Sequence, residues 1–423
     1  MTSINAEYRP RVLDGLLDRY LGVMGAVLIE GPKASGKTAT ALQHAASVVR
    51  LDKDANARTM AEVLPEQTLV GDTPRLIDEW QVVPHLWNLV RHAVDERRSL
   101  SGQFILTGSS VPNDDVNRHS GAGRVAVLQM RPMTLFESGH STGAVSLAEL
   151  MAEGFGPGVG AELGVVDVVE RLVIGGWPGS VDVTVEDAAL INSAYLDQVC
   201  EVDVELVSGR RRNPQLVRRM VASLARHVAT KASLQAIATD AGGAEGSMDR
   251  GTVAEYHAAL ERLHIVEDLP AWNTHLRSKA QLRTAPKRVF VDPSLAVAAL
   301  GAGVSKLLAD LRYTGLLFES MVIRDLRVYA QATDAAVFHY RDSNGLEVDA
   351  VVEKRDGSWA AFEVKMGADD AIESAARNLL RFADTVDTSR VGEPQALVII
   401  VPTGVAYRRP DGVFVVPITA LGP

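Results

Sequence analysis

The chain has 423 residues, of which 47% are hydrophobic and 23% are charged, and its formal net charge is −10. These proportions exclude a disordered or fibrous chain, and the negative charge argues against an affinity of the whole protein for nucleic acid, so any such contact must come from local basic segments. At about 150 residues per domain, the length predicts two or three domains.

The sequence has no apolar run of about 18 residues, and its first seven residues have neither the basic start nor the apolar stretch of a signal peptide. We therefore expect a cytoplasmic protein without a membrane partner. The single cysteine, Cys200, excludes an internal disulfide and a cysteine-based zinc site, and we interpret it as a small buried hydrophobic residue.

The first diagnostic segment lies between a predicted strand and a predicted helix. Residues 8–21 carry an amphipathic helical pattern, residues 26–29 are a short apolar run, and residues 39–49 are again helical in pattern. The segment between strand and helix fits G-x-x-x-x-G-K-[ST] at every fixed position. It consists of Gly31, Pro32, Lys33, Ala34, Ser35, Gly36, Lys37 and Thr38.

This order of strand, glycine-rich loop and helix predicts a phosphate-binding loop, because backbone N–H groups at a helix N-terminus attract an anion. The bound molecule is therefore expected to be a nucleotide. The motif assigns Lys37 to the β- and γ-phosphates and the Thr38 hydroxyl to Mg²⁺.

A second strand is predicted at residues 47–51, a polar stretch follows to about Thr73, and a third strand ends in Asp78 and Glu79. Carboxylates at the carboxyl edge of a parallel sheet lie beside the bound phosphates. Asp78 is therefore predicted to bind the Mg²⁺ shell, and Glu79 to polarise the attacking water. An Asp-Glu pair outside this context is most often a solvated surface pair.

Residues 103–110 predict another buried strand, which ends in small polar residues. Ser109 or Ser110 is a candidate sensor of the γ-phosphate, and a plain strand-to-loop turn is the alternative. A short helix and loop are expected at residues 114–123, before Arg124 and a final strand at 125–130. Arg124 is a candidate for the arginine that reaches into a neighbouring subunit's site in a homo-oligomer, and a surface cation is the alternative.

Several of these segments, together with two later ones, resemble the bacterial and archaeal AAA-type ATPases that carry a C-terminal domain of unknown function. The matching segments are residues 31–38, 76–79, 104–109, 123–124, 132–137 and 175–178. The resemblance implies binding and hydrolysis of ATP on a five-stranded parallel sheet with a small helical lid. We expect residues 1–200 to form this core and lid, with a glycine-rich loop of the lid at residues 154–160.

A winged-helix region is predicted within residues 201–300. Helical patterns run to residue 199 and from 214 to 230. A short helix capped by Ser233 and a second helix from Asp249 to Leu263 follow. Strands are then predicted at 265–268 and 288–291. The residues offered to a DNA groove would be Arg250, Thr252, Glu255 and Tyr256. A basic wing would comprise Arg277, Lys279, Arg283, Lys287 and Arg288.

Two glutamates on the second helix, Glu255 and Glu261, weaken the interpretation as a DNA-binding unit. A protein-contact module or a domain spacer is therefore the alternative. A further basic cluster at residues 210–212, with Arg218 and Arg219, has a solvated turn and helix face as its alternative.

Residues 301–423 are expected to form a third, α/β domain. A helix begins at residues 315–322, and strands are predicted at 337–341, 347–352 and 359–365. Asp349, Glu363 and Lys365 fit D-x(n)-[DE]-x-K, and Glu363 and Lys365 share a face of their strand because they are two residues apart. Two carboxylates can hold Mg²⁺, and a neighbouring lysine can orient or deprotonate water for attack on a phosphodiester. Glu319 is the expected fourth member.

This motif resembles the PD-(D/E)XK nuclease superfamily over about residues 315–401, and the same family of ATPases carries it in this position. The resemblance implies a metal-dependent nuclease, with an inactive scaffold used for binding as the alternative. Without a metal ion, the clustered carboxylates would repel each other and the phosphate, so a divalent ion is expected.

The sequence therefore predicts an α/β protein with a P-loop ATPase core, a winged-helix region and a nuclease-like domain. Its expected function is hydrolysis of ATP on or near DNA, with a second, metal-dependent phosphodiesterase site. The rival hypothesis is an ATP-dependent switch or scaffold whose two later domains bind protein partners.

Overall fold

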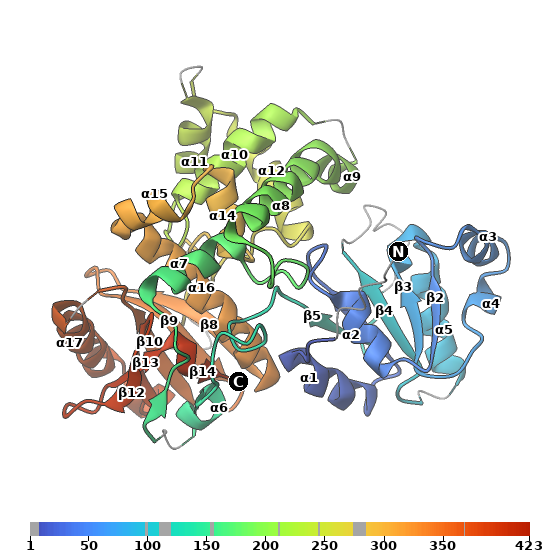
Figure 1. Cartoon of the computed structure of the whole chain (residues 1–423). Coiled ribbons are helices and arrows are strands. Elements are labelled where there is room, and N and C mark those ends of the chain that lie inside the picture. The colour runs from blue at the N-terminus through green and yellow to red at the C-terminus, as the bar shows by residue number, and fades with distance from the viewer. Residues whose placement is uncertain are drawn as a thin grey trace. The chain divides into compact units, whose positions relative to one another are not determined.

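The computed structural model describes residues 8–97, 100–109, 120–152, 156–209, 212–243, 246–273, 285–367 and 369–423 (Figure 1). The chain divides into two compact units. The N-terminal unit consists of Met1–Pro132 with two short segments, Val204–Arg211 and Arg262–His264. The C-terminal unit consists of Met133–Asp203, Arg212–Glu261 and Ile265–Pro423.

A five-stranded parallel sheet forms the centre of the N-terminal unit. Its strands are β1 (Ala26–Glu30), β2 (Ser47–Arg50), β3 (Arg75–Asp78), β4 (Phe104–Gly108) and β5 (Val125–Gln129). They lie in the order β2-β3-β4-β1-β5, and every neighbouring pair is parallel. The predicted five-stranded parallel sheet is confirmed. The loop after β1 and the ends of β3 and β4 therefore meet at one edge of the sheet.

Helices cover both faces of this sheet. They are α1 (Val12–Leu21), α2 (Lys37–His44), α3 (Ala55–Val63), α4 (Pro65–Thr68) and α5 (Leu86–Glu96). Successive strand residues point to opposite faces, so Val27 and Ile29 of β1 lie in a buried cluster with Leu17 of α1. Leu28 instead packs in a second cluster with Val90 of α5.

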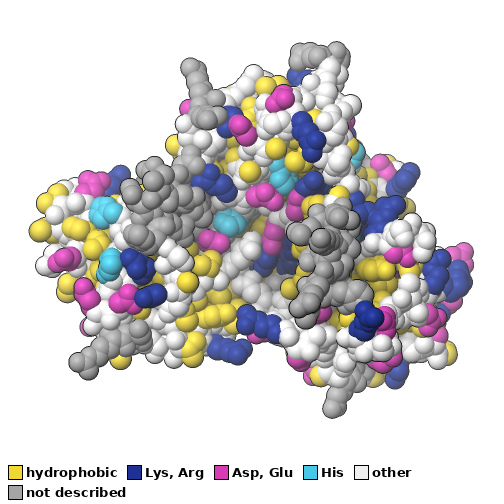
Figure 2. Space-filling view, turned by 180° about the vertical axis from the view of Figure 1, so that it is seen from behind, with side chains coloured by type: hydrophobic (Ala, Val, Ile, Leu, Met, Phe, Trp, Pro, Cys, Tyr) yellow, Lys and Arg dark blue, Asp and Glu magenta, His cyan; other side chains and the backbone are white. Residues whose placement is uncertain are grey.

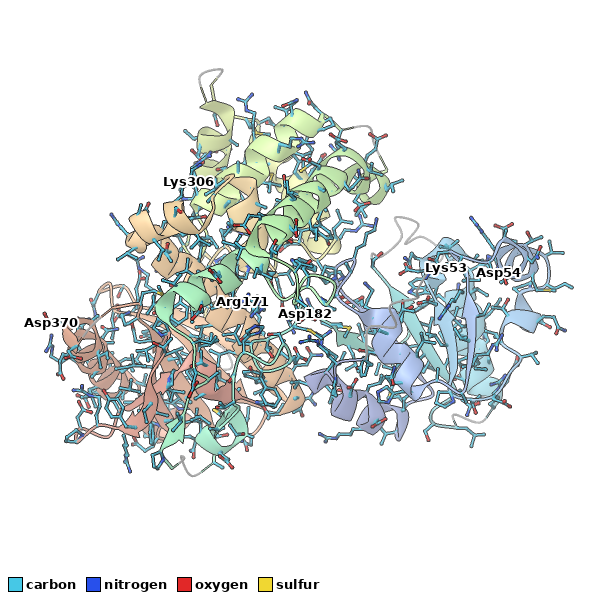
Figure 3. The ribbon with its side chains drawn as sticks, in the orientation of Figure 1. Lys53, Asp54, Arg171, Asp182, Lys306 and Asp370 are labelled. Atoms are coloured by element: carbon cyan, nitrogen blue, oxygen red, sulfur yellow. The ribbon has the colours of Figure 1, made fainter. Side chains whose placement is uncertain are left out.

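The helices of this unit differ from the predicted ones in extent. The first begins at Val12 rather than at residue 8, because Pro10 disfavours helical backbone in the residue before it. The second ends at His44, since Ala45 is extended and the strand begins at Ser47. The predicted polar stretch contains α3, whose first turn is capped by Asp54, labelled in Figure 3, through N–H groups at 2.9 and 3.1 Å.

A seven-stranded mixed sheet forms part of the C-terminal unit. Its strands are β7 (Gly158–Val159), β8 (Ala335–Arg341), β9 (Glu347–Lys354), β10 (Trp359–Val364), β11 (Ala396–Val401), β12 (Val405–Arg408) and β13 (Phe414–Pro417). They lie in the order β7-β12-β13-β11-β10-β9-β8. The pairs β8–β9 and β9–β10 are antiparallel, whereas β11 is parallel to β10 and to β13. A separate pair joins β6 (Val145–Ser146) to β14 (Leu421–Gly422).

Two helices complete this α/β region. The helix α16 (Leu311–Ala332) contacts β8, β9 and β10, and α17 (Asp369–Thr385) lies in the chain between β10 and β11. Phe382 of α17 packs with Trp359 and Ala361 of β10 in a buried cluster. The predicted helix and the three predicted strands are therefore confirmed. The prediction of a loop at residues 154–160 is wrong at residues 158–159, which form β7 and pair with β12. Residues 153–155 lie outside the described part of the chain.

The remaining helices lie mainly between residues 147 and 309. They are α6 (Leu147–Leu150), α7 (Val165–Ile174), α8 (Val185–Gln198), α9 (Val204–Ser208), α10 (Pro214–Arg226), α11 (Leu234–Gly242), α12 (Arg250–Arg262), α14 (Pro293–Ala299), α15 (Val304–Ala309) and the late α18 (Thr388–Val391). Both short helices predicted at 233–242 and 249–263 are confirmed as α11 and α12. Antiparallel bridges join Thr230 to Arg288, Val266 to Phe290 and Leu269 to Lys287.

The expected domain boundary near residue 200 differs from the division between the units after Pro132. Backbone contacts explain why residues 133–203 group with the C-terminal unit. The Met133 N–H donates to Gly176 O at 2.6 Å, and the Gly176 N–H donates to Asp292 Oδ2 at 2.9 Å. Buried Arg324 donates to the same Asp292 oxygen at 2.7 Å, so this segment is fixed to α14 and α16.

The surface carries charges of both signs. On the face seen in Figure 2, Lys and Arg side chains are interspersed with Asp and Glu side chains. Among the residues with a described structure, no helix combines the length and apolar character that a membrane span requires.

Candidate functional site

The phosphate-binding loop connects β1 to α2 as predicted. Gly36 precedes α2 with φ at 99°, a left-handed conformation that favours glycine. Gly31 is required for a different reason, because a Cβ there would lie 2.1 Å from Met130 O. The loop backbone therefore fits closely against the residue that follows β5.

Lys37 is buried, and its ammonium lies over the loop that precedes it. Its Nζ donates to Gly31 O at 3.0 Å and to Pro32 O at 2.8 Å. Burial lowers the pKa of Lys37 to about 8, although Glu79 and Asp78 favour the charged form. The structure thus brings Lys37 close to the acidic pair at the end of β3.

Two hydroxyl groups converge on one oxygen of Asp78. Thr38 Oγ1 donates to Asp78 Oδ1 at 2.7 Å, and Thr107 Oγ1 donates to the same atom at 2.6 Å. Asp78 is 2% exposed. Sequence reasoning assigned no role to Thr107, although a polar residue that follows three apolar residues in a buried strand was a signal for one.

Glu79 follows β3 in a left-handed conformation, with φ at 57°. Its N–H donates to Thr107 Oγ1 at 3.2 Å, and Gln81 Nε2 donates to its carboxylate. Burial is the largest influence on its carboxyl group and raises the pKa of Glu79, which favours a group that can accept a proton from water. Gln81 is a second contact that the sequence did not predict.

Arg11 fixes the loop from the N-terminal side. Its Nη1 donates to Ser35 O at 2.8 Å, and its Nη2 donates to Arg131 O at 2.7 Å. The side chain is buried at 6% exposure. One guanidinium therefore ties the phosphate-binding loop to the segment after β5.

Two further predicted residues lie at the ends of β4 and β5. Ser109 is buried directly after β4, whereas Ser110 and most of the helix predicted at 114–123 lie outside the described residues. Arg124 donates from Nε to Asp95 Oδ1 of its own unit at 2.9 Å. The structure does not test the predicted role of either Ser109 or Arg124.

This arrangement fits Mg²⁺–ATP. The loop residues 31–38 would present backbone N–H groups and Lys37 to the phosphates of a bound nucleotide, and Thr38 and Asp78 carry oxygen atoms of the kind that Mg²⁺ prefers as ligands. A bound Mg²⁺ would neutralise charge on the phosphates. The chain's own residues would hold the nucleotide and orient a water beside Glu79.

A second acidic site lies at the end of the β9–β10 hairpin. The pairing of Ala350 with Phe362 places Asp349 beside Glu363. The Val364 N–H donates to Asp349 Oδ2 at 2.9 Å, while Lys365 Nζ lies 2.5 Å from Glu363 Oε2 and 3.6 Å from Asp349 Oδ2. The structure therefore brings together the three residues of the predicted motif.

These residues open into a pocket of about 650 Å³. Its lining residues are Gly345, Glu347, Asp349, Glu363, Lys365, Ser374, Ala375, Arg377, Asn378 and Arg381. Asn378 of α17 donates to Glu363 Oε1 at 2.7 Å and to Glu347 O at 2.7 Å. Arg377 and Arg381 are one helical turn apart and exposed. The α17 residues were not predicted, because nothing near them in the sequence indicates the hairpin they face.

Glu319 joins this site through a lysine that was assigned elsewhere. Lys287 Nζ donates to Glu319 Oε1 and lies 3.2 Å from Asp349 Oδ1. Burial raises the pKa of Glu319 and the nearby Asp349 adds to this, whereas Lys287 opposes both. Three carboxylates therefore face two ammonium groups, those of Lys287 and Lys365.

This charge count corrects the argument that the clustered carboxylates require a metal ion to offset their repulsion. Glu319, Asp349 and Glu363 supply oxygen ligands that suit a divalent ion. Much of their negative charge is, however, already compensated within the chain. The donor set fits a divalent ion, but charge alone does not demand one.

The predicted basic wing is wrong at both of its described positions. Lys287 is 3% exposed and lies in the carboxylate site, and Arg288 is 7% exposed and donates to Asp268. Arg277, Lys279 and Arg283 lie outside the described residues.

The predicted groove-reading face on α12 also differs from the structure. Arg250 and Glu255 are exposed, but Tyr256 is buried beneath the guanidinium of Arg212, which also pairs with Glu255 at 2.8 Å. Tyr256 cannot reach a groove without leaving the core. Arg218 of the second basic cluster pairs with two carboxylates, while residues 210 and 211 are outside the described part.

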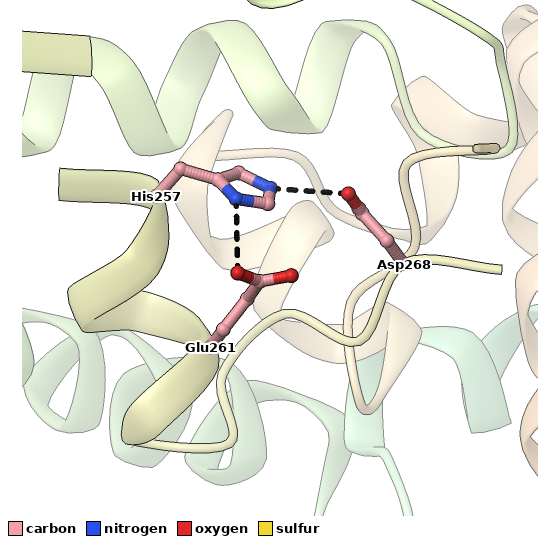
Figure 4. Close-up of side chains that lie close together, drawn as sticks. All are labelled: His257, Glu261 and Asp268. Carbon is pink, nitrogen blue, oxygen red and sulfur yellow. Dashed lines mark ion pairs between the residues drawn. The ribbon is translucent and has the colours of Figure 1, made fainter. Parts of the chain in front are cut away.

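Two residues of α12, His257 and Glu261, form a cluster with Asp268 of the segment that follows (Figure 4). His257 Nδ1 lies 3.4 Å from Glu261 Oε2, and His257 Nε2 lies 3.4 Å from Asp268 Oδ2. The three side chains are close enough to hold a metal ion. Arg288 already donates to Asp268 Oδ2, however, so the cluster has cations of its own and we interpret it as a set of structural ion pairs.

Three segments of the chain match family models. Residues 24–138 match a model described as an AAA domain. Residues 166–306 and residues 314–421 match two models described as domains of unknown function, DUF8612 and DUF4143. The last two matches assign no activity to the C-terminal unit.

The chain is also similar to individual proteins. An uncharacterized protein of Mycobacterium bovis and an uncharacterized protein of Mycobacterium tuberculosis are each 25% identical over 370 residues, which cover 86% of this chain and 75% of the relative. A solved Walker-type ATPase of Pyrococcus abyssi has 12% identity and a TM-score of 0.38, covering 69% of this chain and 99% of that one. At that score the likeness supports no conclusion. The AAA-domain match, taken with the loop geometry, supports a P-loop ATPase in residues 24–138.

Proposed function

We propose that the N-terminal unit binds ATP with Mg²⁺ and hydrolyses it at the edge where β1, β3 and β4 end. The observation that carries this proposal is the convergence of Thr38 and Thr107 on Asp78 Oδ1. That contact joins the phosphate-binding loop to the acidic strand end, which is the arrangement that an Mg²⁺–nucleotide site needs.

Each residue has a distinct role in this proposal. Lys37 binds the β- and γ-phosphates, Thr38 and Asp78 hold the Mg²⁺ shell, and Glu79 orients the attacking water. Thr107 positions Asp78 and the backbone of Glu79. Ser109 remains the candidate sensor of the γ-phosphate, because it directly follows β4, the strand that contains Thr107.

We propose that Arg124 acts across an interface between copies of the chain. Its pair with Asp95 is exposed on both sides, at 41% and 38% of the two side chains, and exposed pairs contribute little stability. A neighbouring nucleotide could therefore replace Asp95 as its partner. Mixed samples of Arg124→Ala and Glu79→Gln subunits should recover some hydrolysis, and no recovery in a proven oligomer would exclude the role.

We also propose that the C-terminal unit holds a metal-dependent phosphodiesterase site. The support is the joint position of Asp349, Glu363 and Lys365 in a pocket with two basic residues of α17. A nuclease-like fold agrees with the order of the surrounding elements. These are α16, the antiparallel strands β8, β9 and β10, then α17, and β11 parallel to β10. The carboxylates would hold the metal ion, Lys365 would orient the attacking water, and Arg377 and Arg381 would bind the phosphate backbone.

Nucleic acid is the proposed substrate or partner of the C-terminal unit. The helices α10, α11 and α12 with their three antiparallel bridges have the order of a winged helix. The burial of Lys287, Arg288 and Tyr256 removes three of the predicted DNA contacts, which favours the rival protein-binding role for this helical region. We therefore assign the contact with nucleic acid to the pocket rather than to the winged helix.

The test is an incubation of the intact protein with single-stranded, duplex and branched DNA, with and without Mg²⁺, Mn²⁺ and ATP. The Asp349→Ala variant should lose cleavage and keep ATP hydrolysis, whereas Lys37→Ala should lose ATP binding and keep its fold. Lys53→Ala is a matched control, because Lys53 is an exposed lysine of the N-terminal unit outside the loop (Figure 3). Cleavage that persists in Asp349→Ala, or that never occurs, would leave the site as a binding scaffold.

A further inference from the structure

The carboxylate site of the C-terminal unit contains a cation from outside the hairpin motif. Lys287 follows the segment at residues 274–284 and precedes α14, whereas its partners Glu319 and Asp349 belong to α16 and β9. Its Nζ donates to Glu319 Oε1, lies 3.2 Å from Asp349 Oδ1 and lies 3.5 Å from Asp349 O. At 3% exposure, the lysine is buried among these oxygens.

The backbone of Lys287 is held independently of this contact. Its N–H donates to Leu269 O at 3.0 Å, and its carbonyl accepts from the Leu269 N–H at 2.9 Å. The ammonium is therefore positioned by a backbone bridge as well as by the charges it meets. The Lys287 side chain could therefore leave the space between Glu319 and Asp349 while its backbone stayed in place.

A divalent ion between these two carboxylates would need the same oxygen lone pairs that Lys287 uses. Magnesium binds oxygen ligands at about 2.0–2.1 Å, so a divalent ion held by the carboxylate oxygens that Lys287 contacts would lie against the ammonium. Their like charges repel, and a buried pair of this kind is poorly screened. The two cations exclude each other from this position.

We propose that Lys287 is an internal competitor for divalent cations and sets the metal affinity of the carboxylate site. Metal binding at Glu319 and Asp349 requires the ammonium to leave. This inference rests on the proposed metal site of the C-terminal unit but not on its proposed nuclease activity. Lys365 does not have this role, because it belongs to the hairpin motif and is 30% exposed toward the pocket.

The test is a Mn²⁺ titration of the intact protein, with free Mn²⁺ measured by electron paramagnetic resonance. The titrations are made without ATP and on the Lys37→Ala background. Mn²⁺ then cannot bind together with a nucleotide at the N-terminal unit. Lys287→Met should lower the dissociation constant at least about tenfold, because one like charge is removed from the position. Lys306→Met is the matched control, since Lys306 is an exposed lysine of α15 in the same unit (Figure 3), and its titration should equal that of the parent.

A further variant separates this inference from the proposed nuclease. Adding Asp349→Asn to Lys287→Met should abolish the gained Mn²⁺ affinity, and affinity that survives would place the ion elsewhere and overturn the inference. Equal dissociation constants with and without Lys287 would overturn it while leaving the metal site intact. Absence of Mn²⁺ binding in every variant would overturn both proposals, whereas loss of DNA cleavage alone would affect only the nuclease.

Lys287→Met leaves buried carboxylates without their partner, so a measurement on the unmodified side chain is needed as well. Reductive methylation of the wild-type protein, read by mass spectrometry at Lys287, should increase when Mn²⁺ is added, because the displaced ammonium loses its carboxylate contacts. Labelling of Lys306 should not change. Labelling of Lys287 that is the same with and without bound Mn²⁺ would overturn the inference.

Discussion

The ion pairs around His257 predict a stability that depends on pH. Burial disfavours the imidazolium, but Asp268 and Glu261 outweigh it and raise the pKa of His257 to about 9. An ordinary histidine has a pKa of about 6.5. Because the folded-state value is the higher one, the stabilisation is complete below the unfolded value and is lost as the pH rises through about 9.

The size of this effect follows from the difference between the two pKa values. A difference of about 2.5 at about 1.36 kcal/mol for each pKa unit gives about 3 kcal/mol as an upper value. Replacing His257 by glutamine removes the titrating group. The free energy of unfolding should therefore separate wild type from His257→Gln most strongly near pH 6 and least near pH 10.

Urea denaturation of both proteins at pH 6 and pH 10, followed by circular dichroism, measures this difference. The gap between wild type and His257→Gln should shrink by about 2–3 kcal/mol between the two pH values. His92→Gln is a control for the loss of a histidine, because His92 is an exposed residue of α5 outside these ion pairs. A gap for His257→Gln that is equal at pH 6 and pH 10 would refute the reasoning.

Three further predictions follow from the contacts described above. Binding of ATP at pH 8.5 should take up protons, because the lowered pKa of Lys37 leaves its amine partly neutral and the phosphates favour the charged form. Calorimetry in two buffers of different ionisation enthalpy measures this proton uptake. Zero uptake would contradict the prediction. Arg324→Met should lower the free energy of unfolding by about 3–5 kcal/mol in urea, since two buried carboxylates lose their partner, whereas the exposed Arg312→Met should cost little. Arg377→Gln with Arg381→Gln should weaken binding of a short single-stranded DNA and reduce the slope of log affinity against log salt by about 1–2, and an unchanged slope would remove these residues from the interface.

Local patterns were sufficient to predict that the loop after β1 and the acidic end of β3 meet at one edge of the sheet. The residues from Gly31 to Thr38 are consecutive, and Asp78 ends a strand whose parallel neighbours can be read from apolar runs. The position of an acidic residue at a strand end then fixes its position at the sheet edge. The polar position of Thr107 in a buried strand signals a role but does not name its partner, because only the β3–β4 pairing brings it to Asp78.

The carboxylate site of the C-terminal unit could be predicted only in part, for a related reason. Asp349, Glu363 and Lys365 belong to one hairpin, so alternation along two neighbouring strands is enough to gather them. Lys287 also lies in this site, although it precedes Glu319 by 32 residues and Asp349 by 62 residues in the sequence. Among other basic residues it resembled an exposed wing, because sequence does not distinguish a lysine that meets phosphate from one that meets a buried carboxylate.

The measurement that tests the central claim most directly compares ATP binding with ATP hydrolysis in wild type, Lys37→Ala and Glu79→Gln. Binding is followed with a fluorescent ATP analogue, and hydrolysis by release of inorganic phosphate in the presence of Mg²⁺. The account predicts that wild type binds and hydrolyses ATP, that Lys37→Ala does neither, and that Glu79→Gln binds ATP while hydrolysing it at least about 100-fold more slowly. Normal ATP affinity in Lys37→Ala, or undiminished hydrolysis in Glu79→Gln, would contradict it.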